Sequence, residues 1–193
     1  MSGNRSRVDR ILLLVAGDRD RELLGDWLAT EPGYEAVGVD SPAAVEAVDY
    51  DLCLVDQFWF DGVADRLRAR REAGDSCFLP TLLAVPASRG GEEDDPTVLG
   101  GETAREVIDD VVELPVGKAT LRRRMGNLLR GRHASLDLAA REEQYRELVR
   151  LAPEAILLVR EGRVVHANDA AADLLSPVGA ADLPGRALTE LVG

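Results

Sequence analysis

Residues 50–56 read Tyr-Asp-Leu-Cys-Leu-Val-Asp, an apolar run that is too short for a helix and ends on the carboxylate of Asp56. Buried strands of parallel sheets have this pattern, because they are covered on both faces and become polar only where they reach the surface. In open α/β sheets, ligands bind beyond the carboxyl ends of such strands. Asp56 is therefore the first candidate functional residue, although a lone carboxylate at a strand end can also simply meet solvent.

Outward from this strand, apolar runs alternate with helical patterns over the first two thirds of the chain. Because parallel neighbours need right-handed helical crossovers, this alternation predicts an α/β fold with a doubly wound, five-stranded parallel sheet. The turn Val15-Ala16-Gly17-Asp18 lacks a glycine-rich phosphate loop, which disfavours nucleotide-dependent enzymes. The other strands are predicted over 11–16, 34–39, 78–85 and 111–114, and the helices over 21–29, 41–48, 61–73, 102–108 and 118–132.

The composition is that of a globular protein with an acidic surface. Hydrophobic residues make up 46% of the 193 residues, and no apolar run approaches the roughly 18 residues that span a bilayer. We therefore expect a cytoplasmic protein that does not contact a membrane. The 35 acidic residues outnumber the 23 basic ones, and the net charge of −12 argues against direct nucleic-acid binding by this chain. An acid-rich, lysine-poor composition also suggests a halophilic source.

Residues 8–132 resemble a response-regulator receiver domain. The resemblance rests on the order of the βα units, on Asp56 at the end of the third strand, and on Leu114-Pro115 where the family has Lys-Pro. It implies a receiver- or flavodoxin-like sheet with strand order 2-1-3-4-5. It also makes Asp56 the candidate phosphoacceptor, since the family's aspartate receives a phosphoryl group whose charge is offset by Mg²⁺.

The chain departs from the family at the positions that would supply positive charge. The acidic pair that holds Mg²⁺ in the family falls on Val15 and Ala16, and the lysine is replaced by Leu114. Asp18 and Asp20 lie just beyond this position and are weak candidates for metal ligands. Without them, the resemblance implies no metal site.

Two interpretations of Asp56 follow. We favour a pseudo-receiver, in which Asp56 is retained but is not phosphorylated. The alternative is an active phosphorelay receiver that is phosphorylated on Asp56, with Asp18 or Asp20 as a metal ligand.

The pattern changes near Ser135. Residues 135–151 carry apolar side chains at helical spacing among charged ones, which predicts an amphipathic linking helix that ends before Pro153. A hairpin is predicted over 155–167 with Glu161-Gly162 as its turn, and Asn168 is the expected cap of the next helix.

This last part of the chain resembles the opening half of a PAS sensory domain. The segments that carry the resemblance are Tyr145-Arg146-Glu147-Leu148, Ala152-Pro153-Glu154-Ala155-Ile156, Val165-His166-Ala167-Asn168 and Gly185-Arg186. We therefore divide the chain into a receiver-like domain over 8–132, a linking helix over 133–151 and an incomplete, α+β PAS-like domain over 152–193. His166, Cys53 and Cys77 do not form a haem or flavin attachment signature. No cofactor is assigned, and a PAS ligand stays open.

The two resemblances together imply a signal-transduction input module that regulates a larger protein. The arrangement is similar to the amino-terminal part of a halophile sensor histidine kinase or of a bacterio-opsin-activator-like transcription regulator. We expect no catalytic activity in this chain, because it contains no kinase ATP-binding region. It contains no helix-turn-helix either, so the choice between a kinase and a transcription regulator stays open. Protein partners or a second copy are expected to bind through the 118–132 helix and the linking helix.

Overall fold

The computed structural model describes residues 7–73, 77–86, 101–175 and 183–191. Contacts between Cα atoms divide the chain into two units, Met1–Leu136 and Asp137–Gly193. No helix among the described residues is both long enough and apolar enough to cross a membrane. Residues 88–101, a glycine-rich and acidic stretch of the sequence, lie almost entirely outside the described residues.

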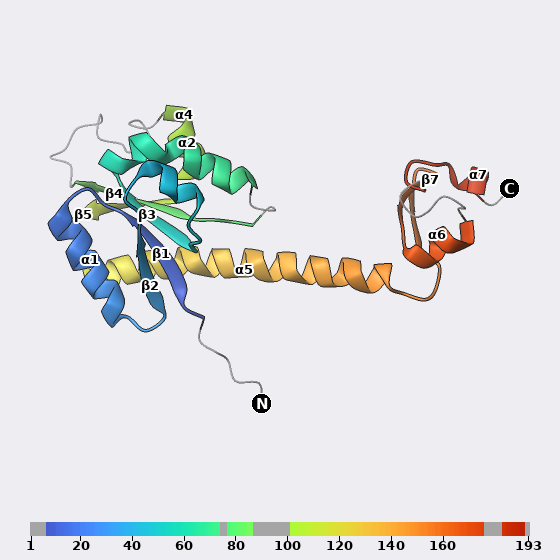
Figure 1. Cartoon of the computed structure of the whole chain (residues 1–193), viewed down its shortest axis with the longest axis horizontal. Helices are drawn as coiled ribbons and strands as arrows, with labels where there is room; N and C mark the ends of the chain where they lie inside the picture. Colours follow the sequence, from blue (N-terminus) through green and yellow to red (C-terminus); the bar gives the residue numbers. More distant parts are fainter. Residues whose placement is uncertain (1–6, 74–76, 87–100, 176–182, 192–193) are drawn as a thin grey trace. The chain divides into compact units, whose positions relative to one another are not determined.

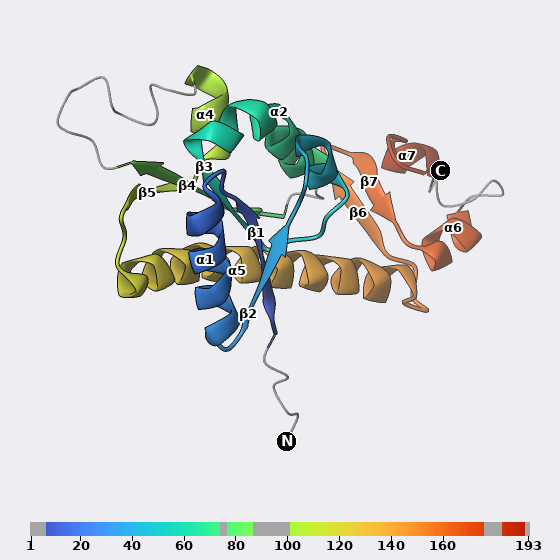
Figure 2. The ribbon, with the colours of Figure 1, turned by 60° about the vertical axis from the view of Figure 1, so that its left-hand side comes forward.

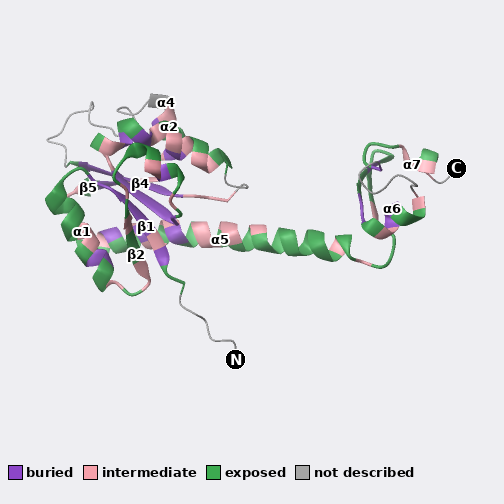
Figure 3. Ribbon diagram, in the orientation of Figure 1, coloured by how far each residue is buried: buried purple, intermediate pink, exposed green. Residues whose placement is uncertain are grey.

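The first unit is built on one parallel sheet (Figure 1). Its strands run in the order β2-β1-β3-β4-β5, so the predicted fold class and strand order are confirmed. The side chains of β1, β3 and β4 are almost all buried, because helices cover both faces of the sheet (Figure 3). The bounds are Asp9–Leu14 for β1, Tyr34–Gly38 for β2, Leu52–Asp56 for β3, Thr81–Pro86 for β4 and Asp110–Leu114 for β5.

Two apolar cores lie on the two faces of this sheet. Helices α1 (Asp18–Thr30) and α5 (Lys118–Arg150) cover one face, where Trp27 and Met125 pack on alternate strand residues. The 3₁₀ helix η1 (Pro42–Glu46), α2 (Gln57–Ala73) and α4 (Gly101–Val107) cover the other face. Figure 2 shows α1 and α5 on one side of the strands and α2 and α4 on the other.

Three helix predictions need correction. The segment predicted as a helix over 41–48 is only a short 3₁₀ helix, and the Ser41 side chain does not cap it. Helix α2 begins at Gln57, directly after β3, rather than at residue 61, because the Asp56 side chain caps it. The helix predicted over 118–132 and the linking helix predicted over 133–151 are one continuous helix, since α5 runs to Arg150 and contains no proline.

The second unit contains a hairpin and two short helices. Strands β6 (Leu157–Arg160) and β7 (Arg163–Ala167) pair in antiparallel fashion, as predicted. Glu161 and Gly162 connect them with φ values of 50° and 76°, the left-handed pair that a two-residue hairpin turn requires. The helices are α6 (Asp169–Leu175) and α7 (Leu188–Leu191), and α6 packs its two buried alanines against β7.

Candidate functional site

Asp56 is the last residue of β3 and lies at the carboxyl edge of the sheet, opposite Ala84 of β4. The four residues before it are buried, whereas Asp56 itself is half-buried. This is the position that the apolar run predicted, at the edge where α/β sheets bind ligands.

Both carboxylate oxygens of Asp56 accept a backbone hydrogen bond. The N–H of Ala16, two residues after β1, donates to Oδ2 at 2.7 Å. The N–H of Trp59, in the first turn of α2, donates to Oδ1 at 2.9 Å. Asp56 is therefore the cap of α2 and also ties β1 to β3, because the first amides of a helix have no partner within the helix.

Asp18 and Asp20, the weak candidates for metal ligands, occupy the first turn of α1. Asp18 is exposed and forms a 2.5 Å ion pair with Arg21, whose guanidinium also donates to the backbone oxygen of Val15 at 3.2 Å. Within the described ranges, no group of three or more acidic, histidine or cysteine side chains could hold a metal ion. The two residues that directly follow β1, Val15 and Ala16, are apolar.

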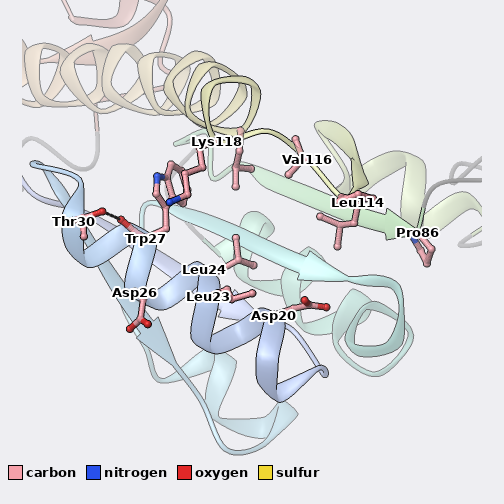
Figure 4. A pocket seen from close by; sticks show the side chains of 12 residues that line it. Asp20, Leu23, Leu24, Asp26, Trp27, Thr30, Pro86, Leu114, Val116 and Lys118 are labelled. Atoms are coloured by element: carbon pink, nitrogen blue, oxygen red, sulfur yellow. Dashed lines mark hydrogen bonds between the residues drawn. The ribbon is translucent and has the colours of Figure 1, made fainter.

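An open groove of about 730 Å³ lies between α1 and the beginning of α5 (Figure 4). Its floor is formed by apolar side chains, among them Leu24, Trp27 and Leu114. Asp20 lines one part of the groove and Lys118, the only lysine of the chain, lines another. Leu114 stands where the receiver resemblance would place a lysine, so this wall is apolar instead of cationic.

Helix α1 is tied to α5 beside this groove by the carboxylate of Glu31. The indole nitrogen of Trp27 donates to Glu31 Oε1 at 3.0 Å, and the Arg122 guanidinium binds the same carboxylate. The hydrogen bond from Arg122 lowers the pKa of Glu31 below its ordinary value. Arg122, one of the basic residues of α5, is thus paired within the protein, so its presence is no sign of nucleic-acid binding.

A second polar cluster lies at the opposite, amino edge of the sheet, and sequence reasoning missed it. Asp9 begins β1 and Asp51 precedes β3, and both are more than nine-tenths buried as whole residues. Arg132 and His133 of α5 approach them, with His133 Nε2 2.7 Å from Asp9 Oδ1 and Arg132 Nε 3.8 Å from Asp51 Oδ1. The sequence feature that could have revealed this cluster is an acidic residue at or directly before the start of each of two largely apolar strands.

In the second unit, Asn168 organises the chain around the start of α6. Its amide nitrogen donates to the backbone oxygens of Ala152 and Glu154, at 3.2 Å and 2.8 Å. Its side-chain oxygen accepts from the N–H of Ile156 at 2.8 Å and from that of Ala171 at 2.9 Å. The predicted cap is confirmed, and Asn168 also closes the loop before β6.

The family model of the PAS domain matches residues 143–192. No curated protein matches the chain. The PAS match covers the carboxyl-terminal part of α5 and nearly all of the rest of the second unit.

Solved structures are similar to between 63% and 80% of the chain. NtrX from Brucella abortus, in complex with ADP, has 19% identity and a TM-score of 0.53, over 80% of this chain and 32% of NtrX. A fusion that carries the trimeric coiled coil of yeast Spc42 has 17% identity and a TM-score of 0.52, over 74% of this chain and 94% of the fusion. The receiver domain of a sensor histidine kinase from Pseudomonas aeruginosa has 14% identity and a TM-score of 0.47, over 63% and 98%.

These likenesses concern the fold, and the chain spans about a third of NtrX. The chain therefore joins a unit with the receiver fold to a segment, residues 143–192, that matches the PAS domain family.

Proposed function

We propose that this chain is a signal-transduction input module, in which a receiver-type unit that does not accept a phosphoryl group is coupled to a PAS sensor. In this proposal the receiver-like domain covers residues 8–132, the linking helix 133–151 and the PAS-like domain 152–193. The module would regulate a histidine kinase or a transcription regulator, and we assign no enzymatic activity to it.

The proposal rests on the hydrogen bonds that the Asp56 carboxylate already accepts. Both of its oxygens accept backbone hydrogen bonds, from Ala16 and from Trp59. A phosphoryl group on either oxygen would remove one of these bonds, and with it either the cap of α2 or the link to β1. Helix α2 begins directly at Gln57, so no loop separates the carboxylate from the helix.

Electrostatics supports the same conclusion. A phosphoryl group beside a carboxylate needs a nearby cation, since two like charges at 4 Å repel by about 4 kcal/mol at the effective dielectric of a protein surface. Val15, Ala16 and Leu114 occupy the positions that would hold or supply this cation. Asp18 is already paired with Arg21.

The alternative, an active phosphorelay receiver, is favoured by one observation. Asp56 lies half-buried at the carboxyl edge of the sheet, and Asp20 lines the groove near the same edge. If α1 shifted at its first turn, Asp18 or Asp20 could serve as a metal ligand.

Intact mass separates these two functions. The chain is incubated with acetyl phosphate and Mg²⁺ beside the variant Asp56→Asn, and we expect no gain of mass in either protein. A receiver domain of known activity, treated in the same tube, verifies that the phosphodonor works. A gain of one phosphoryl group in the parent and none in Asp56→Asn would overturn the pseudo-receiver.

We further propose that a second copy of the chain binds through α5. The exposed apolar side chains of its second half, Leu138, Tyr145 and Leu148, follow a spacing close to that of a coiled-coil seam. Sedimentation in high salt is expected to find a dimer, and Leu138→Asp together with Leu148→Asp is expected to give a monomer. A parent chain that sediments as a monomer would contradict this.

A further inference from the structure

One turn of α5 is fastened to the starts of three strands of the first unit. Arg132, His133 and Ser135 make these contacts, and we call them, together with Asp9 and Asp51, the exit clamp. The three helix residues lie immediately before Leu136, the last residue of the first unit. The clamp uses no residue of the Asp56 site or of the groove.

The backbone of Phe78, which precedes β4, is bound at both of its polar groups by this turn. Arg132 Nη1 donates to the backbone oxygen of Phe78 at 3.1 Å. The N–H of Phe78 donates to the Ser135 hydroxyl oxygen at 2.8 Å. Arg132 and Ser135, which lie within one helical turn, therefore bind both the backbone oxygen and the backbone N–H of Phe78.

The carboxylates of Asp9 and Asp51 complete the clamp. Asp9 meets His133, and Asp51 accepts hydrogen bonds from the Arg7 guanidinium at 2.8 Å and from the N–H of Arg10 at 3.1 Å. The Arg132 side chain is only 16% exposed and that of Asp51 only 12%. Because a buried charge that loses its partner is strongly unfavourable, this cluster is expected to form as a whole or to open as a whole.

Beyond the clamp, α5 buries no side chain. Leu129 is the last buried residue of the helix, whereas Leu138, Tyr145 and Leu148 are exposed by 64%, 69% and 64%. An isolated helix shorter than about 12–15 residues is only marginally stable in water, since the first turn is costly to form. The segment after residue 136 therefore depends on the turns that precede it.

We propose that the exit clamp is a conformational device that determines whether α5 is continuous. When the clamp is closed, the ordered turn at residues 132–135 lets the helix extend to Arg150 and into the PAS-matching segment. When it is open, the helix frays back toward Leu129, and the receiver-type unit is uncoupled from that segment. This mechanism stands whether or not Asp56 is ever phosphorylated.

Amide hydrogen exchange on the full chain tests this device. In Ser135→Ala, the N–H of Phe78 loses its acceptor, and we expect amides of residues 133–150 to exchange about tenfold faster, with residues 118–129 unchanged. Alanine is the better helix former, so a purely local effect would slow exchange instead. Asp137→Ala, at an exposed position two residues away, is the matched control and is expected to slow exchange or leave it unchanged.

A second pair of variants tests the buried carboxylate. Asp51→Asn is expected to accelerate exchange in residues 133–150 more than in the sheet, whereas Asp49→Asn, whose exposed side chain pairs with Arg70, should not. Equal slowing by Ser135→Ala and Asp137→Ala would overturn the clamp. So would a uniform acceleration of the whole chain by Asp51→Asn, since that would mean general stability and not control of the helix.

Discussion

Asp56 combines a position typical of a reactive residue with contacts typical of a structural one. Its carboxylate ends a buried strand, caps α2 and binds the end of β1. Reactive groups are commonly held in arrangements that cost stability, whereas capping residues contribute to it. The change in stability when Asp56 is replaced therefore indicates whether the residue is structural or reactive.

Replacing Asp56 is expected to destabilise the first unit in a graded order. Asp56→Ala removes both acceptors and should cost about 1–3 kcal/mol, of which loss of the cap alone is typically about 1. Asp56→Asn keeps one oxygen acceptor but directs an NH₂ group at the second donor, so it should fall between the parent and Asp56→Ala. Urea unfolding measures this order, and a variant more stable than the parent would indicate a strained, functional carboxylate.

The two cysteines should differ in reactivity, because only one is fully buried. Cys53 lies inside β3 with no exposed surface, and burial raises the pKa of its thiol, so it stays protonated at pH 8. Cys77 is half-buried. Iodoacetamide is expected to modify Cys77 alone in the native protein and both residues in urea, as peptide mass analysis can verify. Native labelling of Cys53 at the same rate would show that β3 opens.

At the scale of elements, α5 illustrates how an expected boundary can be misplaced. The change of composition near Ser135 suggested that a separate linking helix begins there. In the structure its hydroxyl oxygen instead accepts a hydrogen bond from Phe78, 57 residues away, and the helix passes through. A change of composition along the chain does not by itself end a helix, because a side chain such as that of Ser135 can bind a distant donor while its backbone stays helical.

Two glycines of α5 provide a matched test of its packing on the first unit. A Cβ atom at Gly126 would meet only Arg130 Nη1 at 3.7 Å, so Gly126→Ala should stabilise the helix by about 1 kcal/mol. A Cβ atom at Gly131 would lie 3.1 Å from Cε1 of Phe78, beneath whose ring the Arg71 guanidinium packs. Gly131→Ala should therefore be neutral or destabilising, and equal gains in urea unfolding would contradict this close approach.

At the scale of the whole molecule, the two units differ in the size of their apolar cores. The first unit has two apolar cores on a five-stranded sheet, whereas the core of the second unit is a small cluster on a two-stranded sheet. Two strands alone are marginally stable in water. The exposed Leu158 and Val165 of the hairpin leave part of its surface without cover among the described residues.

Hydrogen exchange should therefore distinguish the two units. Amides of β6, β7 and α6 are expected to exchange much faster than those of β1, β3 and β4, because they open without unfolding of the first unit. Equal protection in both units would mean that the second unit is stabilised by contacts beyond its own small core, for example in a dimer.

The amino-acid sequence by itself determined the fold class, the alternation of strands and helices, the hairpin with its Glu161-Gly162 turn, and the position of Asp56. These features follow from run length, periodicity and turn chemistry, which are local properties of the chain. The resemblance to receivers added the strand order, and the structure confirms it.

Only the tertiary structure decided where α2 begins, that α5 is continuous, and which acids are buried. Asp56 meets Ala16 across 40 residues, and His133 meets Asp9 across 124. Such pairs form because the parallel register brings the ends of distant strands to one edge, and a buried polar group then takes whichever partner lies there. Local patterns carry no information on that partner, so the sequence identified the carboxylate of Asp56 but not the backbone groups that bind it.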